Sequence, residues 1–136
     1  MAAPVELLKR VPLFQGLDEK HLKRVADEFT DRSFVAGQDL TSEGGGGVGF
    51  FVIESGEARV TVDGEERRRL GPGDYFGEVA LLDAGVRTAT VTALEDGKMF
   101  GLTPWQFRPL VEENASIAWP LLQAMAKRTR ELEQPS

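Results

Sequence analysis

The chain has 136 residues, of which 41% are apolar, and a formal net charge of −6. This is about the length of one domain, and no apolar run approaches the roughly 20 residues of a transmembrane helix. No secretory signal is visible at the N-terminus. The absence of cysteine excludes disulfides, thiolate metal sites and cysteine nucleophiles. The sequence therefore predicts a soluble cytoplasmic domain with no membrane segment.

The negative charge is concentrated in the central part of the chain. Residues 1–30 carry five basic and five acidic groups, and residues 105–136 carry four of each, so residues 31–104 hold the whole excess. The one basic cluster, Arg67–Arg69, directly follows two glutamates and is expected to be a solvated strand face. Because nucleic-acid binding depends on neutralising phosphates, this balance argues against direct contact with DNA or RNA.

The first thirty residues predict helices. A short helical turn over Val5–Val11 is expected to stop at Pro12. Asp18 is a good N-cap for a second helix over Glu19–Phe29, whose apolar residues fall on one face.

The pattern changes to strands between Ser33 and Leu102. Short apolar runs are divided by turn signals at regular spacing, which is typical of an antiparallel sandwich or barrel. The dipeptide Asp63-Gly64 separates Arg59–Val62 from Glu65–Leu70 and predicts a two-residue hairpin.

The helical pattern resumes after the strands. Thr103 is the expected N-cap, Pro104 suits the first helical position, and Gln106 completes a capping box. A final helix, from Ser116 or Trp119 to Glu133, has apolar residues at heptad spacing and could be a partner-binding face. The residues expected to be buried by this helix are Leu121, Leu122, Met125 and Leu132.

Together these segments predict an α+β fold that is mainly β. Its centre is an antiparallel β-roll of the double-stranded β-helix or jelly-roll type, over residues 31–102. N-terminal helices over residues 1–30 and a C-terminal helical lid over residues 103–136 flank the roll, so that residues 1–136 form one domain.

One stretch, residues 76–91, carries the chemistry: Phe-Gly-Glu-Val-Ala-Leu-Leu-Asp-Ala-Gly-Val-Arg-Thr-Ala-Thr-Val. Gly77 enters a predicted helical turn, Glu78–Leu82, whose unpaired N–H groups attract an anion. The small side chains of Gly77 and Ala80 would let that anion approach the backbone closely. Arg87 adds a guanidinium that suits paired phosphate oxygens. A carboxylate next to a phosphate is repelled by it unless the carboxylate accepts a hydrogen bond from another group. Glu78 therefore predicts a sugar hydroxyl beside the phosphate.

Residues 76–91 resemble the phosphate-binding cassette of cyclic nucleotide-binding domains. The family pattern is Phe-Gly-Glu-x-Ala-Leu, then a short loop, then Arg-(Ala/Ser/Thr)-Ala-Thr-Val, and every position is matched. Residues 50–57 and 70–78 match further hallmarks of the family. The family includes kinase regulatory subunits, cyclic-nucleotide-gated channels and the bacterial catabolite activator. The resemblance implies a non-enzymatic sensor that binds cAMP or cGMP and uses no other cofactor.

The resemblance also implies a role for individual residues. Arg87 would pair with the exocyclic phosphate oxygen, and Glu78, with Gly77, would hold the ribose 2′-hydroxyl. Backbone N–H groups of Ala80 and of Thr88 or Ala89 would bond phosphate oxygens, and Val79 belongs to the same turn. The Thr88 hydroxyl could bond a guanine amino group, but cAMP-binding relatives also carry threonine or serine there. We favour cAMP, with cGMP as the alternative.

The signal would leave through the C-terminal helix. In the family this helix folds over the base, and the candidates for that contact are Trp119, Leu122, Met125 and Arg128. The partner would be an unknown protein, or a second copy bound through this helix. Family regulators that read DNA append a helix-turn-helix after it, whereas this chain ends at Ser136, so we expect no direct contact with DNA.

The sequence bears on two other classes of function. An enzyme is disfavoured because His21 is the only histidine and lies in a helical pattern, which excludes a cupin-type metal site built from several strand histidines. A ligand-independent interaction module remains open, since some domains of this fold keep the shape without binding nucleotide.

Overall fold

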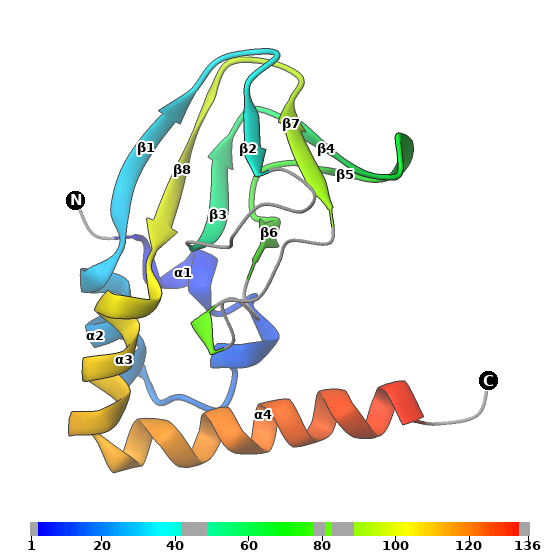
Figure 1. The fold of residues 1–136 in the computed structure, drawn as a ribbon. Coiled ribbons are helices and arrows are strands. Elements are labelled where there is room, and N and C mark those ends of the chain that lie inside the picture. The colour runs from blue at the N-terminus through cyan, green and yellow to red at the C-terminus, as the bar shows by residue number, and fades with distance from the viewer. Residues whose placement is uncertain (1–2, 42–48, 78–80, 83–88, 134–136) are drawn as a thin grey trace.

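The computed structural model describes residues 3–41, 49–77, 81–82 and 89–133, which form two antiparallel sheets above a layer of helices (Figure 1). The helices are α1 (Val5–Leu8), the 3-10 helix η1 (Pro12–Phe14), α2 (Glu19–Glu28), α3 (Pro104–Glu113) and α4 (Ala115–Glu133). The strands are β1 (Thr30–Phe34), β2 (Asp39–Thr41), β3 (Phe50–Ser55), β4 (Ala58–Val62), β5 (Glu65–Leu70), β6 (Tyr75–Phe76), β7 (Thr90–Ala93) and β8 (Gly97–Leu102). The predicted class, a β-roll flanked by helices, is confirmed. None of these helices combines the length and the hydropathy that a membrane span requires.

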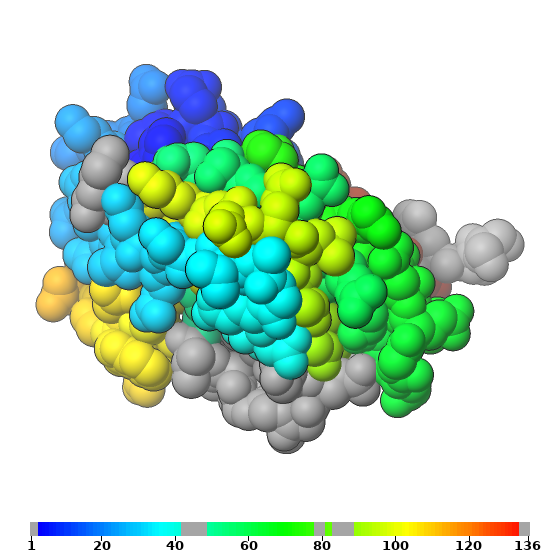
Figure 2. All heavy atoms as spheres, turned by 90° about the horizontal axis from the view of Figure 1, so that it is seen from above, coloured from blue at the N-terminus to red at the C-terminus, as the bar shows by residue number. Residues whose placement is uncertain are grey.

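Each sheet has four strands. One sheet has the order β1-β8-β3-β6, and the other has the order β2-β7-β4-β5. Strand β1 pairs with β8, so that Thr30 lies opposite Gly101. Seen from above, the β1–β2 segment (cyan) lies beside β8 (yellow), and the β4–β5 hairpin (green) protrudes at one side (Figure 2).

The hairpin between β4 and β5 turns where the sequence predicts it. Val62 lies opposite Glu65, so Asp63 and Gly64 are the two turn residues. Both have positive φ, 52° for Asp63 and 79° for Gly64. This is the backbone of a type I′ turn, which asparagine, aspartate and glycine favour because they tolerate positive φ.

Strand β3 of the first sheet is buried on both faces, and it separates two parts of the core. The side chains of Phe50 and Val52 point toward the helices, whereas those of Phe51 and Ile53 point into the roll between the sheets. The alternation follows from the two-residue period of a strand, and it explains why β3 is a continuous apolar run. Gly101, opposite Phe51, leaves space for that ring, since a Cβ there would lie 2.8 Å from Phe51 Cε1.

The N-terminal helices differ slightly from the predicted boundaries. The first helix ends at Leu8, not at Val11, and Pro12 begins η1. A proline suits a first helical position because its φ is fixed and its missing N–H is not needed there. Asp18 caps α2 as predicted, accepting a hydrogen bond of 2.9 Å from the His21 N–H. The helix ends at Glu28 because Phe29 turns to extended backbone and buries its ring.

The α3 cap also matches the prediction. The Thr103 hydroxyl accepts from the Gln106 N–H at 3.3 Å, and Gln106 Oε1 accepts from the Thr103 N–H at 2.9 Å. Both otherwise unpaired donors are thus satisfied.

We expect Thr103→Ala to lower the free energy of unfolding by about 1 kcal/mol, because it removes the capping oxygen. Urea denaturation measures this loss. Thr103→Ser is the matched control, since serine keeps the oxygen and should remain close to the wild type. Equal losses in the two variants would show that the methyl group, rather than the cap, stabilises this position.

The burial predicted for α4 is partly wrong. Leu121 is buried and Met125 is partly buried against the helical core, but Leu122 is 61% exposed and Leu132 is 80% exposed. The helix packs on η1 through its first turns, where a Cβ on Gly16 would lie only 3.1 Å from that of Pro120. The last turns of α4 run on beyond the helical layer (Figure 1), so Leu132 meets no core surface.

Candidate functional site

The cassette lies on the connection between the two sheets. Phe76 ends β6 in the first sheet, and Thr90 begins β7 in the second, so residues 77–89 cross from one sheet to the other. Phe76 is anchored by pairing with Phe51, and the two rings lie 5.2 Å apart between the sheets. The connection therefore starts from a fixed point of the roll core.

Two of the seven predicted ligand residues are described by the structure. Gly77 has φ of +84°, a conformation that side chains rarely adopt, which explains a glycine at this position. Ala89 is half-buried just before β7. The remaining predicted residues, with most of the predicted turn over 78–82, lie outside the described residues; they are Glu78, Val79, Ala80, Arg87 and Thr88. Their roles stay predictions.

The two described leucines of the cassette have opposite environments. Leu81 is 5% exposed and belongs to the core that the helices share with the first sheet. Leu82, its neighbour, is 49% exposed. Among the described cassette residues, Leu81 thus connects the cassette to the helical layer, and this contact was not predicted from the sequence. The apolar pair Leu81-Leu82 at the end of the predicted turn is the sequence signal that could have indicated it.

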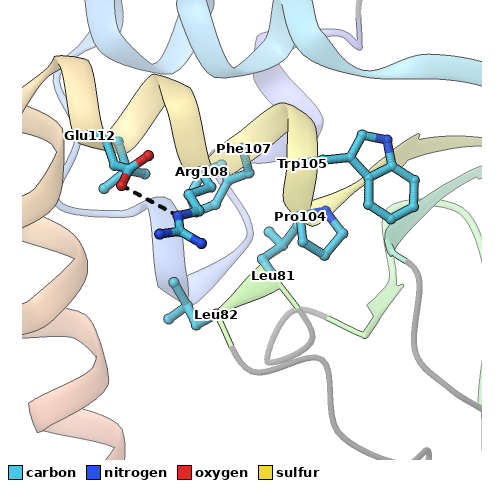
Figure 3. A pocket seen from close by; sticks show the side chains of 8 residues that line it. Leu81, Leu82, Pro104, Trp105, Phe107, Arg108 and Glu112 are labelled. Atoms are coloured by element: carbon cyan, nitrogen blue, oxygen red, sulfur yellow. Dashed lines mark ion pairs between the residues drawn. The ribbon is translucent and has the colours of Figure 1, made fainter.

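A pocket of ≈ 520 Å³ is lined by these leucines and by residues of α3 (Figure 3). It lies beside an ion pair in which Arg108 Nε is 3.3 Å from Glu112 Oε2. Trp105, which the sequence analysis passed over, is 66% exposed at this pocket. The lining residues are Leu81, Leu82, Pro104, Trp105, Phe107, Arg108, Val111 and Glu112.

Hydrogen bonds from α2 hold the junction of α3 and α4. His21 Nε2 lies 3.0 Å from the Ser116 hydroxyl, and Arg24 donates to the side-chain oxygen Oδ1 of Asn114 at 3.4 Å. The Gln106 amide donates to the Glu28 carbonyl at 3.2 Å. The single histidine is therefore a structural contact at the start of α4. Within the described ranges, no group of three or more His, Asp or Glu side chains could hold a metal ion.

The four α4 residues predicted as candidates to cover the nucleotide base lie in different surroundings. Trp119 and Leu122 are 64% and 61% exposed, and Met125 packs against the helical core. Arg128 lines a second pocket, between α4 and the roll.

Comparison with known proteins gives consistent matches. The family model of the cyclic nucleotide-binding domain matches residues 31–114. The chain is 31% identical to the cyclic AMP receptor protein of Thermus thermophilus over 131 residues, which cover 93% of this chain and 61% of that protein. It is 44% identical over 88 residues to a cAMP-dependent protein kinase regulatory subunit of Yarrowia lipolytica, covering 63% of this chain and 24% of the relative. The chain spans less than two thirds of the length of either relative.

Solved structures agree with these matches. The N-terminal domain of a transcriptional regulator from Streptomyces coelicolor superposes with a TM-score of 0.84 and 31% identity, covering 93% of this chain and 94% of that one. The regulatory domain of Toxoplasma gondii PKA, solved with cAMP, superposes with a TM-score of 0.70 and 35% identity, covering 80% of this chain and 43% of that one. With the roll and the cassette between β6 and β7, these matches show that the chain belongs to the cyclic nucleotide-binding domain family.

Proposed function

We propose that this chain is a non-catalytic sensor that binds cAMP, with cGMP as the alternative ligand. The observation that carries the proposal is the complete cassette sequence on the connection between β6 and β7, in a chain that belongs to this family. Relatives named for cAMP and for cGMP support the ligand class. No other cofactor is part of the proposal.

The binding site is assigned by residue. Arg87 pairs with the phosphate, and Glu78 with Gly77 holds the ribose hydroxyl. Backbone N–H groups of Ala80 and of Thr88 or Ala89 complete the phosphate contacts, and Val79 lies in the same turn. Charge-assisted contacts of this kind contribute about 1.5–3 kcal/mol each, so the arginine is the side chain with the largest expected effect on affinity.

The burial of Leu81 suggests how ligand binding at the cassette would change the packing of the helices. Leu81 comes from the cassette, yet it is buried in the core that η1, α2, α3 and α4 share. A ligand shifts a conformational equilibrium only through its different affinities for the two states. A cassette drawn toward the phosphate would displace Leu81 and change the packing of this core, which would reposition α4.

The output is proposed to be a protein contact made by α4, in the cytoplasm, with an unknown partner or a second copy. The exposed side chains of Trp119 and Leu122 offer the surface. The net charge of −6 argues against direct contact of this chain with nucleic acid. In this proposal residues 1–136 act as one domain, with residues 1–30 and 103–136 as helical layers around the roll.

Thermal unfolding with and without each nucleotide tests the proposal. At 100 times its Kd a ligand adds about 2.7 kcal/mol to the free energy of unfolding. For a domain of this size, Tm should rise by on the order of 10 °C. We expect Arg87→Ala to weaken binding roughly 10- to 100-fold, at about 1.4 kcal/mol per decade, and so to reduce this shift.

Arg59→Ala is the matched control, because it removes an exposed strand arginine outside the cassette. The control should keep the full shift. If millimolar nucleotide left Tm unchanged in the wild type, the chain would be a ligand-independent interaction module. If a folded Arg87→Ala protein bound as tightly as the wild type, the assigned phosphate contact would be wrong.

A further inference from the structure

A hydroxyl, an imidazole and a carboxylate lie within hydrogen-bond distance of one another at the junction of α2 and α4. Ser116 Oγ lies 3.0 Å from His21 Nε2, and the other ring nitrogen, Nδ1, lies 2.9 Å from Asp18 Oδ1. A serine beside a histidine that a third group orients is the arrangement that activates a hydroxyl for covalent chemistry. His21 and Ser116 are 95 positions apart in the sequence, so no local motif indicates this arrangement.

The Asp18 carboxylate determines which ring nitrogen of His21 carries the proton. An ionised carboxylate has no hydrogen to donate, so Nδ1 must be the donor of this pair. The same oxygen, Oδ1, also accepts from the His21 backbone N–H at 2.9 Å, which makes Asp18 the cap of α2. In the neutral ring Nε2 therefore keeps its lone pair and faces the Ser116 hydroxyl. A nitrogen in this state can take the hydroxyl proton.

The packing of α2 against α4 holds the base and the nucleophile in place. Leu22, next to His21, and Ile117, next to Ser116, are 2% and 0% exposed in the same core. The His21 side chain is itself only 19% exposed. Ser116 is exposed, so a reagent from solution can reach its hydroxyl. Because both groups stand on packed helices, their distance is fixed more firmly than it would be on a loop.

The start of α4 supplies donors for the negative charge that forms when a serine attacks a carbonyl carbon. The first helical hydrogen bonds run from the N–H groups of Ile117 and Ala118 to the Asn114 carbonyl, at 2.9 and 3.3 Å. The N–H groups of Ala115 and Ser116 precede these bonds, and among the described residues neither has a backbone acceptor. Free donors and the positive end of the helix dipole stabilise an oxyanion.

Trp119 indicates the kind of reagent that this serine would meet. It lies one turn after Ser116 on the same side of α4, and it is 64% exposed. Long side chains of a helix lean back over the preceding turn, so the indole offers an apolar surface beside the hydroxyl. We propose that Ser116 is a covalent modification site, acylated by activated esters that have an aromatic leaving group.

The proposed step is one acyl transfer to the chain and assigns no turnover. Ser116 Oγ forms a bond to the acyl carbon, while the bond from that carbon to the phenolate oxygen breaks and the phenolate leaves with the electron pair. His21 Nε2 takes the hydroxyl proton and releases it to the phenolate or to water. The acylated oxygen can no longer donate to His21, so this hydrogen bond between α2 and α4 is lost. The inference goes beyond the proposed function and does not depend on it, because none of these residues belongs to the cassette.

The test treats the folded chain with p-nitrophenyl acetate and locates the acetyl group by peptide mass spectrometry. We expect an initial burst of p-nitrophenolate with the acetyl group on Ser116, and Ser116→Ala should remove that burst. Ser33→Ala is the matched control, because it removes an exposed serine on β1, away from the only histidine, and it should keep the burst. Acetylation of lysines alone, or an equal burst in Ser116→Ala, would overturn the proposal.

Two variants test the base and the positioning residue. His21→Gln should slow the acetylation of Ser116 by roughly 100-fold or more, which is what a positioned base contributes. Asp18→Asn keeps the helix cap, since asparagine caps as well as aspartate. It should slow the reaction by roughly tenfold to 100-fold, because it removes the charge that stabilises the imidazolium. An unchanged rate in either variant, shown to be folded by far-UV circular dichroism, would contradict the assigned roles.

The ring-nitrogen NMR spectrum gives a readout that a merely structural contact would not change. His21 is the only histidine, so its signals need no assignment. In the wild type the neutral ring should carry its proton on Nδ1, and Asp18→Asn should increase the share of the form protonated on Nε2. A wild-type ring protonated on Nε2 would leave no base facing Ser116 and would refute the proposal without any variant.

Discussion

Replacing Phe50 with alanine should lower the free energy of unfolding by about 3–5 kcal/mol, the largest loss expected from any single substitution discussed for this chain. The ring is fully buried and joins three segments of the helical core to the first sheet. Its centroid lies 5.8 Å from that of Phe14, 5.9 Å from Phe29 and 6.0 Å from Tyr75. Alanine would leave a cavity on which these rings could only partly collapse, because they are held by separate elements.

Urea denaturation followed by circular dichroism measures the loss. Phe50→Leu is the matched control, because leucine keeps most of the buried apolar surface while it removes the edge-to-face contacts. We expect it to lose substantially less than Phe50→Ala. A loss below about 1 kcal/mol for Phe50→Ala would mean that the aromatic cluster does not hold the helices to the sheet.

Replacing Leu81 with alanine should have the second largest effect, with two separable parts. The first is a loss of about 2–5 kcal/mol in the free energy of unfolding, because Leu81 is 5% exposed in the helical core. The second is that ligand binding at the cassette should no longer change the position of α4. Leu82→Ala is the matched control, since this neighbouring side chain is 49% exposed and should cost little stability.

Trp119 provides the readout for the second part. It lies on α4 and is 64% exposed, so its fluorescence reports on the surroundings of this helix. Trp105→Phe removes the only other tryptophan. In that background, cAMP should change the emission of the Leu82→Ala protein but not that of Leu81→Ala, while calorimetry shows that both bind. An unchanged response in Leu81→Ala would contradict the proposed route.

Local chemistry made much of the fold predictable. Asp63-Gly64 determines its own turn because few residues tolerate positive φ. Asp18 and Thr103 determine helix starts because each side chain reaches a nearby N–H group. These interactions span only a few residues, so they are visible in the sequence.

Interactions between distant segments were not predictable in the same way. Leu121 and Leu132 lie on the same face of α4, yet Leu121 is buried in the helical core and Leu132 is 80% exposed. Which part of an amphipathic helix contacts a core depends on how far the surface that it packs against extends. The apolar pattern of the helix does not contain this information. In the cassette, the motif predicts which residues bind the ligand, whereas the burial of Leu81 depends on the helices placed around it.

The pairing of β1 with β8 has a consequence for how quickly the chain folds. Thr30 lies opposite Gly101, so this ladder forms only when the two ends of the roll meet. Closing such a long loop costs entropy before any contact compensates for it, and domains dominated by non-local pairing fold in milliseconds to seconds. Helices α2 and α4 can form transiently within microseconds. We therefore expect the closing of β1 onto β8, rather than helix formation, to limit the rate at which the helical core packs against the first sheet.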